Sequence, residues 1–209
     1  MATELLARAL TSLSRVKDKL KIDSTVSDPV LERLIMGATD YIERICNRKF
    51  KEATYTNEVS SVPGSNAKYI LLKNIPVTTL TTVQYRAGSP ASPTWTSFQT
   101  DDYQLCNDGA SGLVQVAGRV PSGVNSVRTT YTAGYKIDFT KVTDAAFHTL
   151  PFDLSDLCER MVTKMYKKRD QEGQSSSTTP EGGTVTWEGV LNDFDREVLN
   201  SYKRPPAFV

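Results

Sequence analysis

Two amphipathic helical patterns, separated by a long strand-like region, constrain the fold of this chain most. In residues 29–46 apolar side chains recur at three- and four-residue steps, and Asp28 stands before them as a natural N-cap. A similar stripe starts near Pro151 and runs to about Asp170. Since both stripes must be buried, we expect the second helix to pack against the first.

The middle of the chain, residues 50–135, has the composition of short strands divided by turns. Turn-forming sequences such as PGSN and NDGASG separate segments rich in β-branched and aromatic residues. This spacing predicts a small antiparallel sheet, sandwich or open barrel. The expected strands are 68–72, 77–85, 94–98, 103–106, 113–116 and 126–132.

The last expected strand alternates most regularly. In NSVRTTYTAGY one face would carry Val127, Thr129 and Tyr131, while the intervening residues face the other way. The strand then runs into a glycine flanked by tyrosines, an ending that packing alone does not explain.

The C-terminal part changes composition again. Residues 171–183 hold no apolar side chain, which favours a flexible linker or loop. TVTWE, residues 184–188, then alternates like a strand, and apolar residues follow at helical steps up to Tyr202. Such a segment on a tether is poorly placed to complete its own core and well placed to reach a neighbouring molecule.

Together these patterns predict an α+β fold. It comprises a small helical bundle, a large inserted antiparallel β-sheet or sandwich region and an extended C-terminal tail. The expected segments are N-terminal helices at 1–49, the β region at 50–145, a long helix at 146–170 packed on the N-terminal helices, a flexible loop or linker at 171–183 and an interaction tail at 184–209.

Composition excludes several classes of protein. The chain has 25 basic and 24 acidic residues spread along its length, so a general attraction to nucleic acid is not supported. No apolar run approaches the ~20 residues that a membrane span needs, and the N-terminus lacks the order of a signal peptide. We therefore expect no membrane partner and synthesis in a cytoplasm.

Residues able to carry chemistry are few. The single histidine, His148, lies in a loop-like stretch. We therefore expect it at the surface or just before a helix, and not in a catalytic site. No glycine-rich nucleotide-binding loop is present. The cysteines do not have the spacing of metal ligands. We expect them to be buried free thiols in a reducing compartment. They are Cys46, Cys106 and Cys158.

Two carboxylate pairs, Asp101 with Asp102 and Asp193 with Asp195, could bind a cation or act as acid and base. Aspartate is also common in turns and on solvated faces. We expect no catalytic residue, no cofactor and no metal, so the chain is not predicted to be an enzyme.

The basic end of the long helix allows three readings. Lys164, Lys167, Lys168 and Arg169 suit the helix dipole as a solvated last turn, and they also suit contact with a partner protein or with DNA phosphates.

Several motifs follow one another in an order that resembles a known protein family. These motifs are VKDKLKID followed by SDPVLERLIMGATDYIERICNRKF, then LLKNIPVTTLTTVQYR, the strand that ends in YTAGY, the helix LPFDLSDLCERMVTKMYKKRD and the terminal VLNSYKR. In this order they make the chain resemble the head-tail connector (adaptor) proteins of tailed double-stranded DNA bacteriophages, which form rings in the neck beneath the portal. The resemblance covers most of the chain.

The resemblance implies a mechanical role in the virion neck, with synthesis in the cytoplasm of the host bacterium. Identical subunits would form a ring, expected to be twelve-fold, that docks on the portal protein and extends the DNA channel. The ring would present a surface to the next neck or tail-completion protein. Double-stranded DNA would pass through the lumen without sequence-specific binding.

The resemblance also suggests why the alternating strand ends as it does. Gly134 would permit a sharp bend where the sheet closes, and Tyr131 and Tyr135 would pack at the junction.

Candidate contacts in such a ring come from three places in the sequence. They are the N-terminal helix, the basic end of the long helix and the tail, where residues 184–188 could add a strand to a portal subunit or neighbour. The residues concerned are Leu13, Val16, Leu20, Lys167, Lys168, Arg169, Trp187, Phe194, Tyr202 and Arg204.

Two other classes remain open. A packaging or DNA-binding accessory module would use the basic residues Arg15, Lys17, Lys19 and Lys21, although the near-neutral charge argues against it. An enzyme acting through carboxylates would need a cleft with paired acids, which the sequence does not show.

Overall fold

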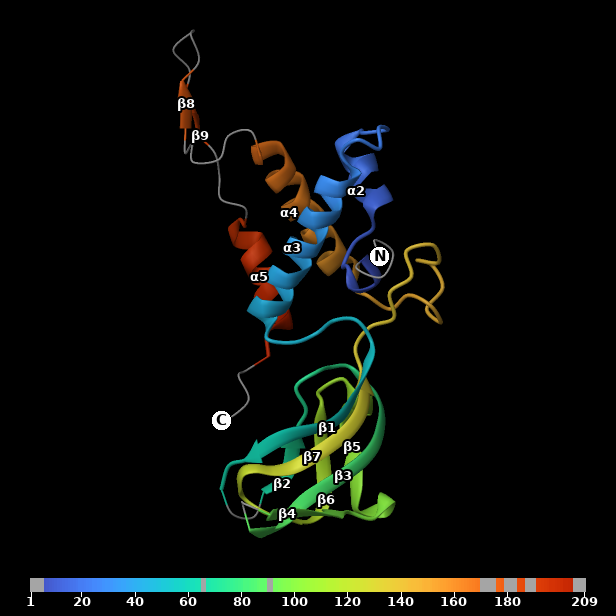
Figure 1. Cartoon of the computed structure of the whole chain (residues 1–209), viewed down its shortest axis with the longest axis vertical. Coiled ribbons are helices and arrows are strands. Elements are labelled where there is room, and N and C mark those ends of the chain that lie inside the picture. Colours follow the sequence, from blue (N-terminus) through green and yellow to red (C-terminus); the bar gives the residue numbers. More distant parts are fainter. Residues whose placement is uncertain are drawn as a thin grey trace. The chain divides into compact units, whose positions relative to one another are not determined.

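The computed structural model describes residues 6–64, 67–89, 92–169, 176–178, 184–186 and 191–204. It divides by contacts into two units, a helical unit of residues 1–46 and 137–203 and a β unit of residues 47–136 and 204–209. Figure 1 shows the helices and one short hairpin in the first unit, and the two larger antiparallel sheets in the second. The predicted α+β class is confirmed. No helix in the described ranges is long and apolar enough to cross a membrane.

The helical unit is built on α3 and α4, which pack together as the two apolar stripes predict. Helix α2 contacts both of them. Leu31 and Ile35 of α3, with Leu154 and Leu157 of α4, are fully buried in its core. The elements are η1 (Leu6–Arg8), α2 (Leu13–Leu20), α3 (Asp28–Cys46), α4 (Phe152–Lys168) and α5 (Asp193–Tyr202).

Local sequence explains where these helices start and stop. Helix α2 begins after Ser12, whose side chain accepts a hydrogen bond from the Arg15 backbone, and it ends at Leu20, followed by Lys21 in a left-handed conformation with a φ of 57°. Asp28, which the sequence predicts to be the N-cap of α3, is instead the first residue of that helix, a difference of one position.

The C-terminal helix corrects one expectation. Helix α5 packs on α3 and α4, with Leu199 only 2% exposed and Asp195 fully buried. The segment therefore completes the core of its own helical unit. Its pattern of apolar residues is short, which is why sequence spacing alone did not reveal the surface it covers.

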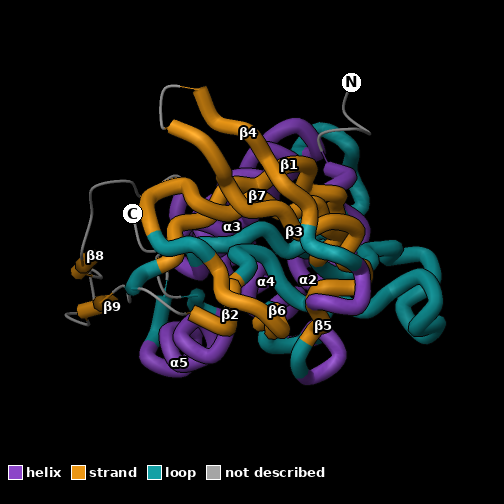
Figure 2. The backbone as a smooth tube through the Cα atoms, turned by 90° about the horizontal axis from the view of Figure 1, so that it is seen from below, coloured by secondary structure: helices purple, strands orange, loops and turns teal. Residues whose placement is uncertain are grey.

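The β unit contains two antiparallel sheets, which Figure 2 shows as separate groups of strands. One has the order β1-β7-β3-β4 and the other β2-β6-β5. Strand β1 was not among the expected strands. The bounds are β1 (Ala53–Val62), β2 (Ala67–Leu71), β3 (Val77–Ser89), β4 (Ser92–Ser97), β5 (Tyr103–Leu105), β6 (Leu113–Val120) and β7 (Gly123–Ala133), with short 3₁₀ turns η2 (Thr100–Asp102) and η3 (Asn107–Gly109).

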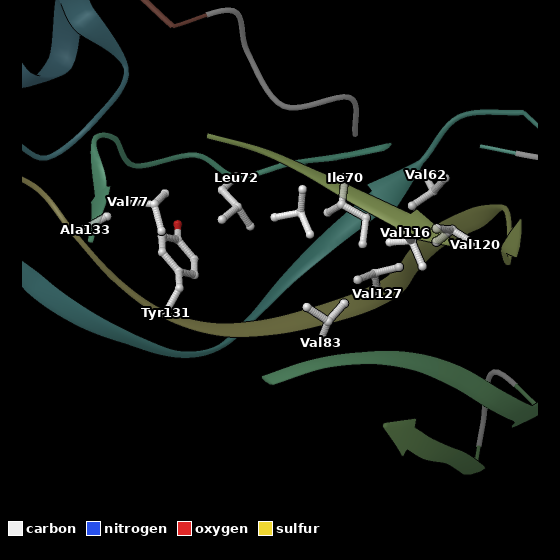
Figure 3. Close-up of a cluster of buried hydrophobic side chains, with 11 residues drawn as sticks. Val62, Ile70, Leu72, Val77, Val83, Val116, Val120, Val127, Tyr131 and Ala133 are labelled. Atoms are coloured by element: carbon white, nitrogen blue, oxygen red, sulfur yellow. The ribbon is translucent and has the colours of Figure 1, made fainter. Parts of the chain in front are cut away.

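The core of the β unit is formed by side chains from both sheets (Figure 3). Val83 and Val127 come from the four-stranded sheet, and Ile70 and Val116 come from the three-stranded one; all four are at most 1% exposed. Strand β7 alternates as expected, because residues 127, 129, 131 and 133 are buried while those between them are partly exposed. This two-sheet core has the arrangement of a sandwich.

The end of β7 has a conformation that favours glycine. Gly134 has a φ of +116°, and a Cβ there would lie 2.6 Å from the Lys51 carbonyl oxygen. The next residue, Tyr135, forms an isolated parallel bridge with Lys51 and stacks on Phe50 with ring centroids 6.4 Å apart. Tyr131 is fully buried. Close backbone approach thus explains why a glycine lies between the tyrosines.

A short hairpin follows α4. Strand β8 (Ser176–Thr178) pairs antiparallel with β9 (Thr184–Thr186). The linker expected at 171–183 therefore contains a strand, and the TVT of TVTWE already has a partner within its own chain.

Candidate functional site

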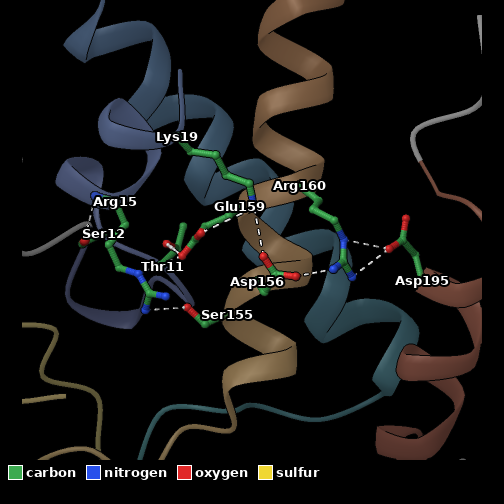
Figure 4. Close-up of polar contacts among 9 residues, drawn as sticks. All are labelled: Thr11, Ser12, Arg15, Lys19, Ser155, Asp156, Glu159, Arg160 and Asp195. Atoms are coloured by element: carbon green, nitrogen blue, oxygen red, sulfur yellow. Dashed lines mark hydrogen bonds and ion pairs between the residues drawn. The ribbon is translucent and has the colours of Figure 1, made fainter. Parts of the chain in front are cut away.

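A network of charged side chains joins the helices of the helical unit (Figure 4). At its centre, Glu159 of α4 is 8% exposed and accepts from Arg15 Nε at 2.9 Å and from Thr11 Oγ1 at 3.1 Å. Lys19 Nζ lies 2.9 Å from Asp156 Oδ1. These pairs fasten α2 and the residues before it to α4.

The same network continues to α5. Arg160 forms an ion pair with Asp156 one turn away and reaches Asp195, with Nη2 2.9 Å from Oδ1. Asp195 is fully buried and also closes the cap of α5, where its carboxylate accepts from the Asn192 backbone. Lys164 Nζ lies 3.7 Å from the second Asp195 oxygen.

The neighbouring cations lower the pKa of the Asp156 carboxyl. Partial burial raises the pKa of its carboxyl, but the hydrogen bond from Lys19 and the charge of Arg160 outweigh burial, so the pKa lies below its ordinary value. The carboxylate is therefore charged at neutral pH, as the ion pairs require.

Three of the four cations that a DNA-binding module would use form ion pairs within the chain, while the fourth, Lys21, is exposed. Arg15 pairs with Glu159, Lys19 pairs with Asp156, and Lys17 Nζ lies 2.8 Å from Asp28. Paired cations release fewer counterions on binding a phosphate backbone. The arrangement is therefore suited to joining helices, and it gives little support to the packaging-factor alternative.

The two carboxylate pairs lie in different settings. Asp195 is buried while Asp193 is fully exposed, and Asp102 caps a 3₁₀ turn by accepting from the Gln99 backbone. Within the described ranges no three metal-binding side chains gather in one place. One member of each pair, Asp195 or Asp102, therefore caps the start of a helix.

His148 lies in a loop before α4, as expected, yet it is only 5% exposed. Its ring lies between Phe139 and Phe152, at centroid distances of 5.3 and 6.3 Å, and Nδ1 accepts from the Asp138 backbone. The expectation of a surface residue was thus wrong, because the aromatic neighbours cover the imidazole.

The cysteines are free, and two are buried. Burial raises the pKa of the Cys158 thiol to about 12, so the reactive thiolate is scarce at neutral pH. Cys46 is also fully buried, whereas Cys106 is only partly covered. The buried-thiol prediction holds for two of the three residues.

The contact residues expected on the N-terminal helix differ in exposure. Val16 is fully buried within the helical unit, so its role is in the core. Leu13 and Leu20 are partly exposed.

The basic end of α4 presents cations at the surface. Lys167 and Arg169 are exposed and Lys168 is partly exposed. The Arg169 guanidinium lies over the ring of Tyr166, 4.0 Å from its centroid. The positive charge of this last turn suits a helix C-terminus, which carries a partial negative charge.

The described contact residues expected in the tail have different partners. Phe194 is 60% exposed with the Arg160 guanidinium over its ring, and Tyr202 donates to the Asp153 carboxylate at 2.8 Å. Arg204 donates to the Leu72 carbonyl at 2.7 Å. Trp187 lies outside the described residues.

Several exposed apolar side chains were missed by sequence reasoning. Phe152 is 61% exposed at the start of α4, and Val59, Tyr69 and Leu71 are exposed on β1 and β2. The second group lines a groove in the β unit. Its signal in the sequence is the run YILL, in which apolar residues occupy both faces of a strand.

Comparison with known proteins gives a consistent picture. A family model described as head completion protein matches residues 9–205. None of the curated protein sequences matches this chain. Among solved structures, a chain of the neck of an empty GTA particle computed with C6 symmetry is 15% identical, with a TM-score of 0.58 over 93% of this chain and 90% of that one.

Two further structures share the fold. In the neck of a native GTA particle computed with C12 symmetry, a chain is 15% identical with a TM-score of 0.57, covering 99% of this chain and 92% of that one. In the virion of a native gene transfer agent (GTA) particle the values are 16%, 0.55, 93% and 90%. Since the family model spans nearly the whole sequence, this chain belongs to the head completion protein family.

Proposed function

We propose that this chain is a structural neck protein of a phage-like virion, where identical copies form a ring beneath the portal. The family match over residues 9–205 carries the proposal. The fold shared with chains from GTA necks, over at least 90% of either chain, supports it. The ring would extend the DNA channel and offer an attachment surface to the next neck or tail protein.

A twelve-fold ring is the expected assembly. The related necks were computed with C6 and C12 symmetry, and twelve subunits are compatible with both. A closed ring needs heterologous contacts, in which one patch of a subunit meets a different patch of its neighbour. A single chain therefore must expose two distinct surfaces.

The helical unit offers such surfaces. Phe152 and Phe194 are large aromatic side chains about three-fifths exposed, and aromatic residues are enriched at interface centres. The exposed cations Lys167 and Arg169 provide a second, polar surface. We assign these to contacts with neighbouring subunits or the portal, together with Leu13, Leu20, Lys168, Tyr202 and Arg204.

The role is mechanical. DNA would pass through the lumen without sequence-specific contacts, which fits a net charge of +1 and cations already paired with carboxylates. Binding of a portal would stabilise the ring, and no chemical step is required of the chain.

The direct test is to count this protein in purified virions by quantitative mass spectrometry, relative to the portal protein. We expect equal copy numbers. Absence from finished particles would overturn the proposal and would favour a packaging factor that leaves after the head is filled.

The contact surface can be tested with one substitution. Phe194→Ser should reduce incorporation into virions without unfolding the chain, since the side chain is already largely exposed. Val26→Ser is the matched control, because Val26 is 86% exposed and lies in a loop that we assign to no contact. Equal incorporation of both variants would remove Phe194 from the interface.

Deletion of residues 184–209 is a poorer test than the sequence suggests. It would remove Leu199 and Asp195, which are buried in the helical unit. A loss of portal binding would then reflect a damaged core as much as a missing contact.

A further inference from the structure

The β unit carries an apolar groove between two edge strands. Strand β1 is an edge of the four-stranded sheet and β2 is an edge of the three-stranded sheet. The groove has a volume of about 420 Å³, within the range of sites that hold organic ligands. On its walls Val59, Tyr69 and Leu71 are 45%, 53% and 38% exposed.

The two walls also offer backbone groups. A strand at the edge of a sheet has N–H and C=O groups on its outer side that no neighbouring strand pairs, and exposed apolar side chains there invite an extended segment. Such a segment would form main-chain hydrogen bonds along the edge and would cover the apolar side chains with its own. This combination favours a peptide strand over a compact ligand.

One end of the groove is basic. Lys73 and Arg204 belong to its lining, just beyond the end of β2, and the Arg204 guanidinium donates to the Leu72 carbonyl at 2.7 Å. The acidic residue of the lining, Glu58, is engaged by the Tyr131 hydroxyl, which donates to it at 2.7 Å. Within the described ranges neither Lys73 nor Arg204 forms an ion pair with a carboxylate.

A second arginine adds positive charge beside Arg204. Burial, and then the charge of Arg48, lowers the pKa of Arg204. Arg48 is only 4% exposed, with its guanidinium over the ring of Phe50, and its Nε has no hydrogen-bond partner among the residues that the structure describes. An anion bound at this end would relieve the repulsion between the two guanidiniums. A carboxylate suits them, because arginine pairs with carboxylates through two parallel hydrogen bonds.

The surrounding unit has the same sign of charge. Residues 47–136 hold nine basic and five acidic side chains. A positive surface attracts anions in general, duplex DNA included. The apolar walls decide between these partners, because a phosphate backbone does not cover Val59, Tyr69 and Leu71, whereas the side chains of a peptide strand do.

We propose that the groove binds an extended segment of a partner protein that combines apolar side chains with a carboxylate. The segment adds a strand along β2, its apolar side chains cover Tyr69 and Leu71, and its carboxylate pairs with Lys73 and Arg204. The inference concerns the β unit of a single chain and does not depend on the neck role.

Binding can be measured with a synthetic peptide of seven residues, blocked at both termini, with valine at alternate positions and aspartate at each end. The two aspartates allow the strand to bind in either direction. The peptide is titrated into the ¹⁵N-labelled full chain, and the two-dimensional amide NMR spectrum gives both the affinity and the position of binding. We expect the amides of residues 58–62 and 69–73 to shift.

Two matched peptides separate the contributions. One has asparagine in place of both aspartates, which keeps the shape and removes the charge. The other has prolines in the centre, which cannot donate main-chain hydrogen bonds. Each should bind at least tenfold more weakly than the aspartate peptide.

Substitutions in the protein test the same contacts. Lys73→Gln and Arg204→Gln should each weaken binding of the aspartate peptide severalfold, whereas Lys68→Gln should not, because Lys68 is an exposed residue of β2 outside the lining. Tyr69→Ser should also weaken binding severalfold. Its control is Val124→Ser, at a side chain that is 61% exposed on β7 and outside the lining. The amide spectrum of each variant reports whether it is folded.

Three results would overturn the proposal. One is an absence of shifts on both edge strands at about 1 mM aspartate peptide, the weakest affinity that we expect. Another is equal affinity for the aspartate peptide and either matched peptide. The third is a shift of the same amides by a short DNA duplex that binds more tightly than the peptide, which would assign the surface to a phosphate backbone.

Discussion

The helical unit and the β unit are held together by different chemistry. In the helical unit, charged side chains such as Glu159 and Asp195 join helices distant in sequence, beside an apolar core. In the β unit, apolar side chains, many of them valine, fill the space between two sheets, and the hydroxyl of Tyr131 is buried among them. The comparison teaches that the helical unit adds buried ion pairs to its apolar core, whereas the β unit relies mainly on packing.

The hydroxyl of Tyr131 illustrates the neutral chemistry of the β unit. It donates to Glu58 Oε1 at 2.7 Å and accepts from the Asn74 backbone at 3.3 Å. Burial raises the pKa of Tyr131 well above its usual value, and the hydrogen bond to Glu58 adds to the effect. The group is therefore a neutral donor throughout the physiological range.

The largest expected effect is in the helical unit. Asp195→Ala removes a fully buried carboxylate from Arg160 and Lys164 and should lower the free energy of unfolding by about 3 kcal/mol, as for other broken buried pairs. Urea denaturation followed by circular dichroism measures it. Asp193→Ala is the control, because that carboxylate is fully exposed and should matter little. Similar losses in both variants would contradict a role for the buried pair.

The next effect is at the end of β7. Gly134→Ala places a Cβ 2.6 Å from the Lys51 carbonyl at a φ of +116°, which should cost about 2 kcal/mol of unfolding free energy. Gly118→Ala is the control, since nothing lies within 4 Å of a Cβ there and its φ is not positive. Equal midpoints in urea for the two variants would show that the bend tolerates a side chain.

A smaller effect is expected from the buried hydroxyl. Tyr131→Phe leaves the ring in place but removes the hydrogen bonds to Glu58 and Asn74, so we expect a loss of about 1 kcal/mol. Tyr69→Phe, at a side chain that is 53% exposed, is the comparison. If Tyr131→Phe is neutral in chemical denaturation, packing alone stabilises this unit.

The smallest expected effects are changes in stability with pH, and these differ between the two units. The pKa of Asp156 is lowered by folding, so its contribution is complete above the ordinary value of 3.8 and is lost as pH falls below it. The pKa of Tyr131 is raised, so its contribution is complete below the ordinary value of 10.0 and declines as pH rises beyond it.

These two contributions can be measured as the dependence of the melting temperature on pH, with an acid limb at low pH and an alkaline limb at high pH. The melts are followed by the helical circular dichroism signal and by tyrosine absorbance. Asp156→Asn should flatten only the acid limb, and Tyr131→Phe only the alkaline limb. A variant that flattens the opposite limb would break the proposed division between the units.

The resemblance to neck connector proteins was carried by the order of motifs, and the family and structural matches confirm it. The helices at 28–46 and 152–168 were also predictable, since their apolar stripes are long and regular. Strand β1 was missed for a physical reason. Its register shifts between Tyr55 and Glu58, where Asn57 has a φ of 55°, and this bulge interrupts the alternation that marks a strand.

The candidate contact residues show the limit of local patterns. Val16 and Phe194 are both apolar residues at helical steps, yet Val16 is fully buried and Phe194 is 60% exposed. Periodicity locates a stripe, but which part of it is covered depends on helices elsewhere in the chain. The helix at 193–202 shows the same limit, because the surface it covers belongs to α3 and α4.

The sequence by itself determined the two long helices, the alternation of β7 and the glycine at its end, because periodicity and backbone sterics act between near neighbours. Only the tertiary structure decided that Arg15 meets Glu159, that Arg160 meets Asp195, and that a groove lies between β1 and β2. These partners are far apart in the chain. Their contacts depend on how whole elements pack, and many equivalent pairings of the same charges are compatible with the sequence alone.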